Sequence, residues 1–233
     1  MKQIALVVAI LFFAAGCGSD NQPSVNPEER LNYSFDMDAE GWIGGFSDYA
    51  ADREEIYELR FEHTTLPAPL DQEEGALLLS GNNHSDDLFM YLKYRITGLE
   101  PGKAYALQFE VEFASNVADG MIGVGGSPGE GVSIKAGAVS YEPAAKPDAR
   151  GWYRMNIDKG NQNNDGSDMI VIGDFSNDTV NNTYTLKSVK SDEPFTAVAN
   201  ENGELWIIVG SDSGFEATTT IYYNKISITL AEP

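Results

Sequence analysis

The sequence contains a single cysteine, Cys17, among 233 residues. The chain that follows it has no thiol, which excludes a disulfide framework, a cysteine-ligated zinc site and a thiol nucleophile from the folded part. Histidine is almost as scarce, with His63 and His84 as the two examples. We therefore expect a hydrophobic core, not disulfides or zinc, to stabilise the fold.

Basic residues are also few. The chain has 15 Lys and Arg against 36 Asp and Glu, which gives a formal net charge of −21. Nucleic acids and anionic lipid headgroups are bound by basic patches, so this balance argues against both partners. It suits a binder of cations or of neutral polar ligands, although the charge alone is better explained by simple solubility.

Long hydrophobic runs are missing except for Ile4 to Ala15, a run of 12 residues after Lys2. Such a run is too short to span a bilayer core of about 30 Å and is typical of a secretory leader. It ends in Ala14-Ala15-Gly16-Cys17, which resembles the lipobox of bacterial lipoproteins, with Ala14 where that family usually has Leu.

The lipobox resemblance implies cleavage before Cys17 and lipidation of this residue. It also implies an extracytoplasmic protein held to the bacterial membrane by the lipid anchor alone, at the outer membrane or cell surface. The alternative is an ordinary cleaved signal peptide. We accordingly divide the chain into a signal peptide (1–16), a flexible polar tether (17–30) and one folded domain (31–233).

Helical periodicity is nearly absent, and apolar residues alternate with polar ones over many short segments. The clearest segment is 104–114, where Leu107, Phe109 and Val111 share one face. This pattern predicts half-buried antiparallel strands. We expect 88–96 and 104–114 to form a long hairpin, and further strands at 32–36, 57–61, 76–80, 132–139, 152–157, 169–173, 184–189, 205–210 and 220–230. The fold class is all-β, an antiparallel β-sandwich of jelly-roll type.

Two aromatic-rich segments lie at the ends of this domain. One holds Tyr33-Ser34-Phe35-Asp36 followed by Gly41-Trp42, and the other holds Ile221-Tyr222-Tyr223-Asn224-Lys225-Ile226. The arrangement resembles the galactose-binding-like jelly rolls and the carbohydrate-binding modules built on them. That resemblance implies non-catalytic binding of a sugar and a structural Ca²⁺ between the first and last strands, held here by Asp36 and Asn224. Asn224 stands where the family has an acid, so it would contribute an oxygen ligand but no charge.

The densest polar segment is 81–87, whose side chains Asn82, His84, Asp86 and Asp87 we predict to contact the ligand. Amides, an imidazole and carboxylates are the mixture that sugar hydroxyls require. The alternative is a solvated turn whose side chains cap their own backbone. Trp42 and Trp152 are the candidate stacking platforms for a sugar ring, although either tryptophan could be core.

Other polar motifs point away from catalysis. The segment 158–168 has oxygen ligands at alternate positions but lacks the acids and the flanking helices of an EF-hand, so we interpret it as a polar hairpin, with a looser calcium site as the alternative. Gly125-Gly126-Ser127-Pro128-Gly129 cannot be a nucleophile elbow, because Pro128 lacks the N–H that would stabilise the oxyanion. Glu110 and Glu112 fall on the solvent face of their strand. Carbohydrate binding without catalysis is our prediction. A glycan hydrolase or lyase, and an assembly lipoprotein that binds another protein, remain as alternatives.

Overall fold

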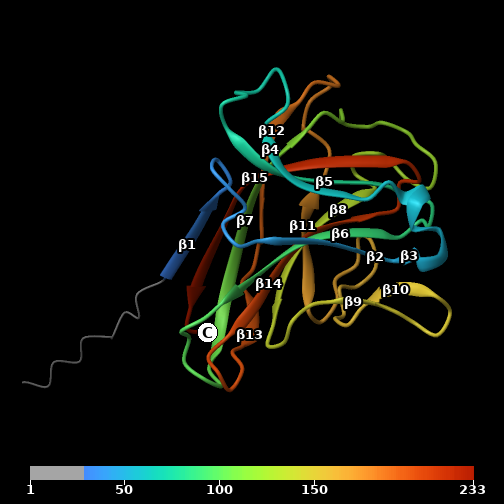
Figure 1. The fold of residues 1–233 in the computed structure, drawn as a ribbon. Coiled ribbons are helices and arrows are strands. Elements are labelled where there is room, and N and C mark those ends of the chain that lie inside the picture. The colour runs from blue at the N-terminus through green and yellow to red at the C-terminus, as the bar shows by residue number, and fades with distance from the viewer. Residues whose placement is uncertain (1–28) are drawn as a thin grey trace, which may run out of the picture.

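The computed structural model describes residues 29–233, so the predicted signal peptide, Cys17 and most of the tether lie outside it. Figure 1 shows two large sheets packed against each other, with a small third sheet at one side. Every strand pair in the described region is antiparallel. No helix within 29–233 is long and apolar enough to cross a membrane. The predicted all-β sandwich is confirmed.

The larger sheet has seven strands in the order β12-β7-β15-β5-β4, with β1 also paired to β15 and β13 also paired to β7. β1 and β5 occupy successive parts of one edge of β15, opposite residues 225–230 and 218–223. The seven strands are β1 (Glu29–Ser34), β4 (Arg60–Thr65), β5 (Gly75–Asn82), β7 (Ala104–Ser115), β12 (Thr185–Lys190), β13 (Phe195–Val198) and β15 (Thr218–Ala231).

The second sheet has five strands in the order β11-β8-β14-β6-β2. They are β2 (Ile43–Ser47), β6 (Leu88–Ile96), β8 (Val132–Val139), β11 (Met169–Asp174) and β14 (Leu205–Ser213). The small sheet has the order β3-β10-β9, from β3 (Tyr49–Ala50), β9 (Ala145–Pro147) and β10 (Trp152–Met155). A 3₁₀ helix, η1 (Ala51–Tyr57), follows β3 directly.

The predicted hairpin between 88–96 and 104–114 is wrong, although both segments are strands. β6 pairs with β14 and β2, whereas β7 pairs with β15, β12 and β13, so the chain crosses from one sheet to the other between them. The seven-residue connection is long enough for this crossing. The apolar faces of the two strands therefore meet across the sandwich, and not within one sheet.

Several strand boundaries also differ from the predictions. β1 begins at Glu29, inside the segment assigned to the tether, and the strand expected at 57–61 begins at Arg60 because η1 extends to Tyr57. β2, β3, β9 and β13 were not predicted. They are short strands, and β2 contains two glycines, so alternation over so few residues gives little signal.

The core between the sheets is built by alternate residues of the long strands. On β7, Leu107, Phe109 and Val111 are fully buried, while Gln108 and Glu110 face solvent, as predicted. β6 and β14 do not show this contrast, because their other face is also covered. A second apolar cluster lies on that face and consists of Phe89, Tyr91, Val139, Ile157, Met169 and Ile208.

Candidate functional site

Trp42 belongs to the core and not to the surface. Its side chain is 2% exposed. Its ring stacks on Tyr94 with the ring centroids 5.3 Å apart, and it forms a T-shaped pair with Tyr33 at a centroid distance of 5.4 Å. A sugar cannot reach a ring that is covered in this way, so the prediction of Trp42 as a stacking platform is wrong. The glycines around it had suggested exposure, but they allow close backbone packing instead.

The predicted polar loop is shorter than expected, because β5 extends to Asn82 and leaves 83–87 as the connection. Asn82 is partly buried, and His84 is exposed with its ring edge-on to Tyr57 at 5.7 Å. The residue that organises the loop is Asn83, which sequence reasoning did not select. Its Nδ2 donates to the carbonyl oxygens of Ser213 and Phe215 at 2.7 and 3.0 Å.

Three polar or glycine-rich loops, 83–87, 120–131 and 158–168, come together at one end of the sandwich. The Nε2 of Gln162 donates to the carbonyl oxygen of Asp86 at 2.7 Å, which joins segment 158–168 to loop 83–87. Gly125 packs against Gly214 so closely that a Cβ at this position would lie 2.4 Å from the Gly214 carbonyl oxygen. The loops 83–87, 120–131 and 158–168 thus share one region with the turn after β14.

Beneath these loops lies a buried group of charges that the sequence analysis missed. Asp212 and Lys135 are both fully buried, and their Oδ2 and Nζ atoms are 3.1 Å apart. The same Oδ2 accepts from the Nζ of Lys159 at 2.9 Å and from the backbone N–H of Gln162 at 2.9 Å. Lys135 completes its three hydrogen bonds with the carbonyl oxygens of Lys159 and Asn164. Because every N–H of this ammonium is used, it is held as a structural cation.

The network continues toward the surface through Asp48, Asp87 and Arg154. Lys159 lies 3.5 Å from Asp48 and 3.6 Å from Asp87, and Arg154 pairs with both of these acids. Burial raises the pKa of the Asp87 carboxyl above its usual value, although Lys159 opposes the shift. Burial alone would lower the pKa of Lys159, but the three neighbouring carboxylates raise it. For Lys135 burial dominates, and its pKa is lowered.

The sequence did carry a signal for this network. Lys135 and Asp212 each stand inside a strand that is otherwise apolar or small, in VSIKAGAV and LWIIVGSDS. A charged side chain on a strand that is buried on both faces needs a partner of opposite charge, because an unpaired buried charge strongly destabilises the folded state. The pairing itself could not be read, since the two residues are 77 positions apart.

Trp152 begins β10 and lines a hollow of about 600 Å³. Its backbone is fixed by pairing with Ala50 on β3 and by the Asp148 carboxylate, which accepts from the backbone N–H of Trp152 at 3.0 Å. The Arg154 guanidinium lies 5.2 Å from the ring centroid. The indole itself is partly exposed. The remaining residues that line the hollow are Ala50, Ala51, Asp52, Arg53, Arg150 and Gly151.

Of the predicted ligand residues, Asp87 and Trp152 are therefore brought near each other, both through Arg154. His84 stands on the neighbouring loop and is connected to the same region by Tyr57 and Tyr49, whose rings are 5.4 Å apart. Asn82 and Asp86 lie on that loop too.

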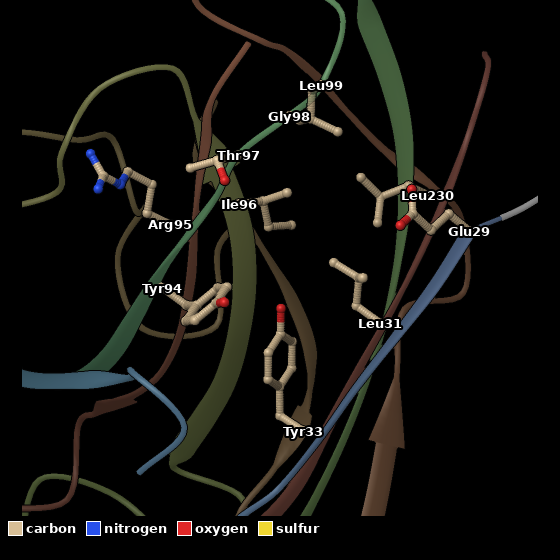
Figure 2. A pocket seen from close by; sticks show the side chains of 10 residues that line it. All are labelled: Glu29, Leu31, Tyr33, Tyr94, Arg95, Ile96, Thr97, Gly98, Leu99 and Leu230. Carbon is tan, nitrogen blue, oxygen red and sulfur yellow. The ribbon is translucent and has the colours of Figure 1, made fainter. Parts of the chain in front are cut away.

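A smaller hollow of about 230 Å³ lies near the start of β1 (Figure 2). The hydroxyl of Tyr33 points into it, toward Ile96 and Leu31. The rings of Tyr33 and Tyr94 are packed against each other at 4.8 Å, and Tyr94 also stacks on Trp42. Both tyrosine rings of this hollow are therefore packed against other aromatic rings, whereas Trp152 has the Arg154 guanidinium beside its ring.

The Ca²⁺ predicted between the first and last strands can be tested against the residues present. Asn224 is fully buried, its Nδ2 donates to the carbonyl oxygen of Gly75 at 3.2 Å, and its Oδ1 has no hydrogen-bond partner within 29–233. Gly75 packs against the carbonyl oxygens of Phe35 and Asp36. Oxygens of this kind suit calcium, but the Phe35 carbonyl oxygen already lies 2.7 Å from the Nε2 of His63. The described chain contains no group of three or more His, Asp and Glu side chains that could hold a metal, so backbone and amide oxygens would have to complete the site.

The other polar motifs behave as structural features. The Asp158 carboxylate accepts from the backbone N–H groups of Gly160 and Ser167 within its own loop. Glu110 pairs with Arg30, and Glu112 pairs with Lys225, on the solvent side of the larger sheet. These acids stabilise local structure and do not form a pair around a cleft.

No family model and no curated protein matches this chain. Among solved structures, the module TmCBM61 in complex with β-1,4-galactotriose is 10% identical with a TM-score of 0.35, and the match covers 80% of this chain and 86% of that one. An apo cyclase from Fischerella sp. is 11% identical with a TM-score of 0.39 over 91% of each chain. The enzymatically active domain of bacteriophage CBA120 tailspike protein 4 is 13% identical with a TM-score of 0.34, over 80% of this chain and 19% of that one.

These neighbours include β-sandwich carbohydrate-binding modules as well as enzymes. Likenesses of this strength carry no argument about function, which has to come from the chemistry of the site.

Proposed function

We propose that this chain is a lipid-anchored extracytoplasmic protein that binds carbohydrate, without catalysis, at the Trp152 hollow. The observation that carries the proposal is the partly exposed indole, which borders a hollow of about 600 Å³ together with charged side chains. A pyranose places its C–H bonds against an aromatic face, while its hydroxyls need donors and acceptors at the rim.

The surroundings of Trp152 support a preformed site. β3 and the turn at 148–151 hold its backbone, and Arg154 holds its ring from one side. Arg154 is in turn held by Asp48 and Asp87. Asp87 thus acts as a positioning residue in the proposal, whereas Asn82, His84 and Asp86 would contact a longer glycan that continues onto loop 83–87. A platform fixed before binding loses little conformational entropy when the ligand arrives.

Binding, and not hydrolysis, is favoured by the carboxylates of the hollow. Glycoside hydrolysis by the common mechanisms requires two carboxyl groups that flank the scissile bond. Asp52 is the one carboxylate among the described residues that line this hollow.

The lipid anchor is part of the proposal because of the leader and Cys17. β1 enters the sandwich on the side away from β3, β10 and η1 (Figure 1), so a chain tethered at its N-terminus would present the Trp152 hollow away from the membrane. Intact mass measurement of protein extracted from membranes tests this part. A mature chain that begins at an unmodified residue would contradict it.

The proposed Ca²⁺ would be held at Asn224 and Asp36 and would tie the first strand to the last. Thermal unfolding with Ca²⁺ or with a chelator tests this assignment. We expect a higher midpoint with Ca²⁺ in the parent and no response in Asn224→Ala; equal midpoints in the parent would exclude the site.

The proposed carbohydrate site is tested by glycan-array screening followed by calorimetry on the parent and on Trp152→Ala. The matched control is Trp206→Ala, because Trp206 is also partly exposed and also lies next to cationic side chains. Trp206 stands six residues, or about 20 Å, along β14 from Asp212, whose charged network leads to Arg154 and Trp152. We expect Trp152→Ala to lower affinity at least about tenfold, roughly 1.4 kcal/mol, and Trp206→Ala to bind like the parent. Unchanged binding by Trp152→Ala, or no glycan bound by the parent, would refute the proposal.

Binding to another protein is the second candidate, because apolar side chains are exposed on two neighbouring loops. Ile122 is 95% exposed and Val180 is 87% exposed, and the backbone N–H of Asp119 donates to the Thr179 carbonyl oxygen, which joins their loops. Exposed apolar patches are common at protein interfaces. If this surface carries the function, Ile122→Ser combined with Val180→Ser will abolish capture of a cell-envelope protein that Trp152→Ala still captures.

A further inference from the structure

We infer that the glycan bound at the Trp152 hollow is acidic and built with uronic acids; this inference rests on the proposed carbohydrate site. It begins with the distribution of arginine. The chain has six arginines and a net charge of −21. Two of the six, Arg53 and Arg150, line this one hollow, and a third, Arg154, lies against its tryptophan.

The hollow is also where arginine is left without an internal partner. Four of the arginines form ion pairs with acidic side chains, namely Arg30 with Glu110, Arg60 with Glu62, Arg95 with Glu204, and Arg154 with Asp48 and Asp87. Within residues 29–233, the guanidinium groups of Arg53 and Arg150 have no ion pair and no hydrogen bond. In a chain with 36 acidic residues, two unpaired arginines at the same hollow point to a partner from outside.

A carboxylate is the partner that fits a guanidinium best. The planar fork of arginine donates two parallel hydrogen bonds to the two oxygens of a carboxylate, and such charge-assisted bonds are roughly twice as strong as neutral ones. A uronic acid offers this carboxylate on the rim of a pyranose ring whose face can stack on Trp152. Asp52, at the same rim, can accept hydrogen bonds from the sugar hydroxyls.

The net negative charge of the chain does not prevent a uronate carboxylate from binding at this hollow. Asp148, the carboxylate of the turn at 148–151, accepts hydrogen bonds from the backbone N–H groups of Trp152 and Arg150, and these bonds, together with the charges of Arg154 and Arg150, lower its pKa. More distant acids are screened at physiological ionic strength, where the Debye length is about 8 Å. Direct contact with two guanidinium groups therefore decides the local preference.

The test compares a trisaccharide of galacturonic acid with its carboxyl-reduced neutral counterpart by calorimetry at fixed ionic strength. We expect the acidic trisaccharide to bind at least about tenfold more tightly to the parent. Arg53→Gln and Arg150→Gln should each remove most of that preference, because the acidic trisaccharide loses a charge-assisted bond and therefore more affinity than the neutral one. Arg60→Gln is the matched control, because this nearby arginine is already paired with Glu62, and it should keep the preference. Unfolding midpoints should be unchanged in Arg53→Gln and Arg150→Gln, since these side chains make no internal ion pair.

The outcomes separate the inference from the proposed function. If the neutral trisaccharide binds as well as the acidic one, and the arginine variants bind both like the parent, the inference is overturned while the carbohydrate site stands. Tighter binding of a sulfated trisaccharide than of the uronate also overturns it. If neither sugar binds, or Trp152→Ala leaves binding of both unchanged, the proposed function fails and the inference fails with it.

Discussion

Replacing Asp212 by Asn removes one negative charge from the centre of the buried network and keeps nearly the same volume. In the parent, Asp212 Oδ2 accepts from Lys135 at 3.1 Å, from Lys159 at 2.9 Å and from the backbone N–H of Gln162 at 2.9 Å. Lys159 keeps Asp48 and Asp87 in the variant, but Lys135 loses the one carboxylate that it contacts among residues 29–233. A fully buried ammonium is then left without a counterion.

Breaking a buried ion pair by removing one partner typically costs about 3–5 kcal/mol, and we expect a loss in this range for Asp212→Asn. Urea unfolding followed by tryptophan fluorescence measures it as a lower midpoint at an unchanged slope. The matched control is Asp192→Asn, an exposed aspartate, which should change stability by less than about 0.5 kcal/mol.

A double-mutant cycle shows whether the loss comes from the pair. Lys135→Met combined with Asp212→Leu removes both buried charges, so the double variant should be much more stable than the sum of the two single changes implies. A loss below about 1 kcal/mol in Asp212→Asn, or strictly additive effects in the cycle, would refute the reasoning that this pair is buried and mutually neutralising.

Two further predictions concern the core and the acid range of stability. Trp42→Ala should lower the free energy of unfolding by about 3–5 kcal/mol, because the ring is buried against Tyr94 and Tyr33. The same variant should bind glycan like the parent. A stability loss below about 1 kcal/mol would show that the indole is exposed. For Asp174, burial would raise the pKa, but hydrogen bonds from Ser176 and Lys187 outweigh it and hold the pKa below the usual 3.8. The stabilising contribution of Asp174 is therefore present above about pH 4 and is lost as the pH falls through the folded-state pKa. Between pH 5 and pH 3 the parent should lose more unfolding free energy than Asp174→Asn. Parallel plots of unfolding free energy against pH for the two proteins would contradict this.

Local pattern was a good guide to the strands. β6 and β8 begin and end at the predicted residues, and the buried and exposed faces of β7 follow the sequence alternation. Alternation reports which face of a strand is apolar, but it does not report which strand lies beside it. That is why β6 and β7 were assigned to one hairpin, when a seven-residue connection can equally carry the chain across the sandwich.

The candidate site was foreseen only in part. Trp152 and Asp87 were selected from the sequence, and the structure places both against Arg154. Trp42 was selected by the same reasoning and is buried, because the flexibility of neighbouring glycines does not reveal whether an aromatic ring is covered. Asp212, Lys135 and Lys159 were missed, since their pairing joins three segments that are distant in the chain.

The sequence by itself determined an all-β, cysteine-poor and strongly acidic domain, because composition and a two-residue period depend on each residue and its near neighbours. Only the tertiary structure decided which strands pair, which tryptophans are partly exposed, and that Arg53 and Arg150 meet at one hollow beside Trp152. These features depend on contacts between residues that are far apart in the chain, and no local pattern records which distant segments the core will bring together.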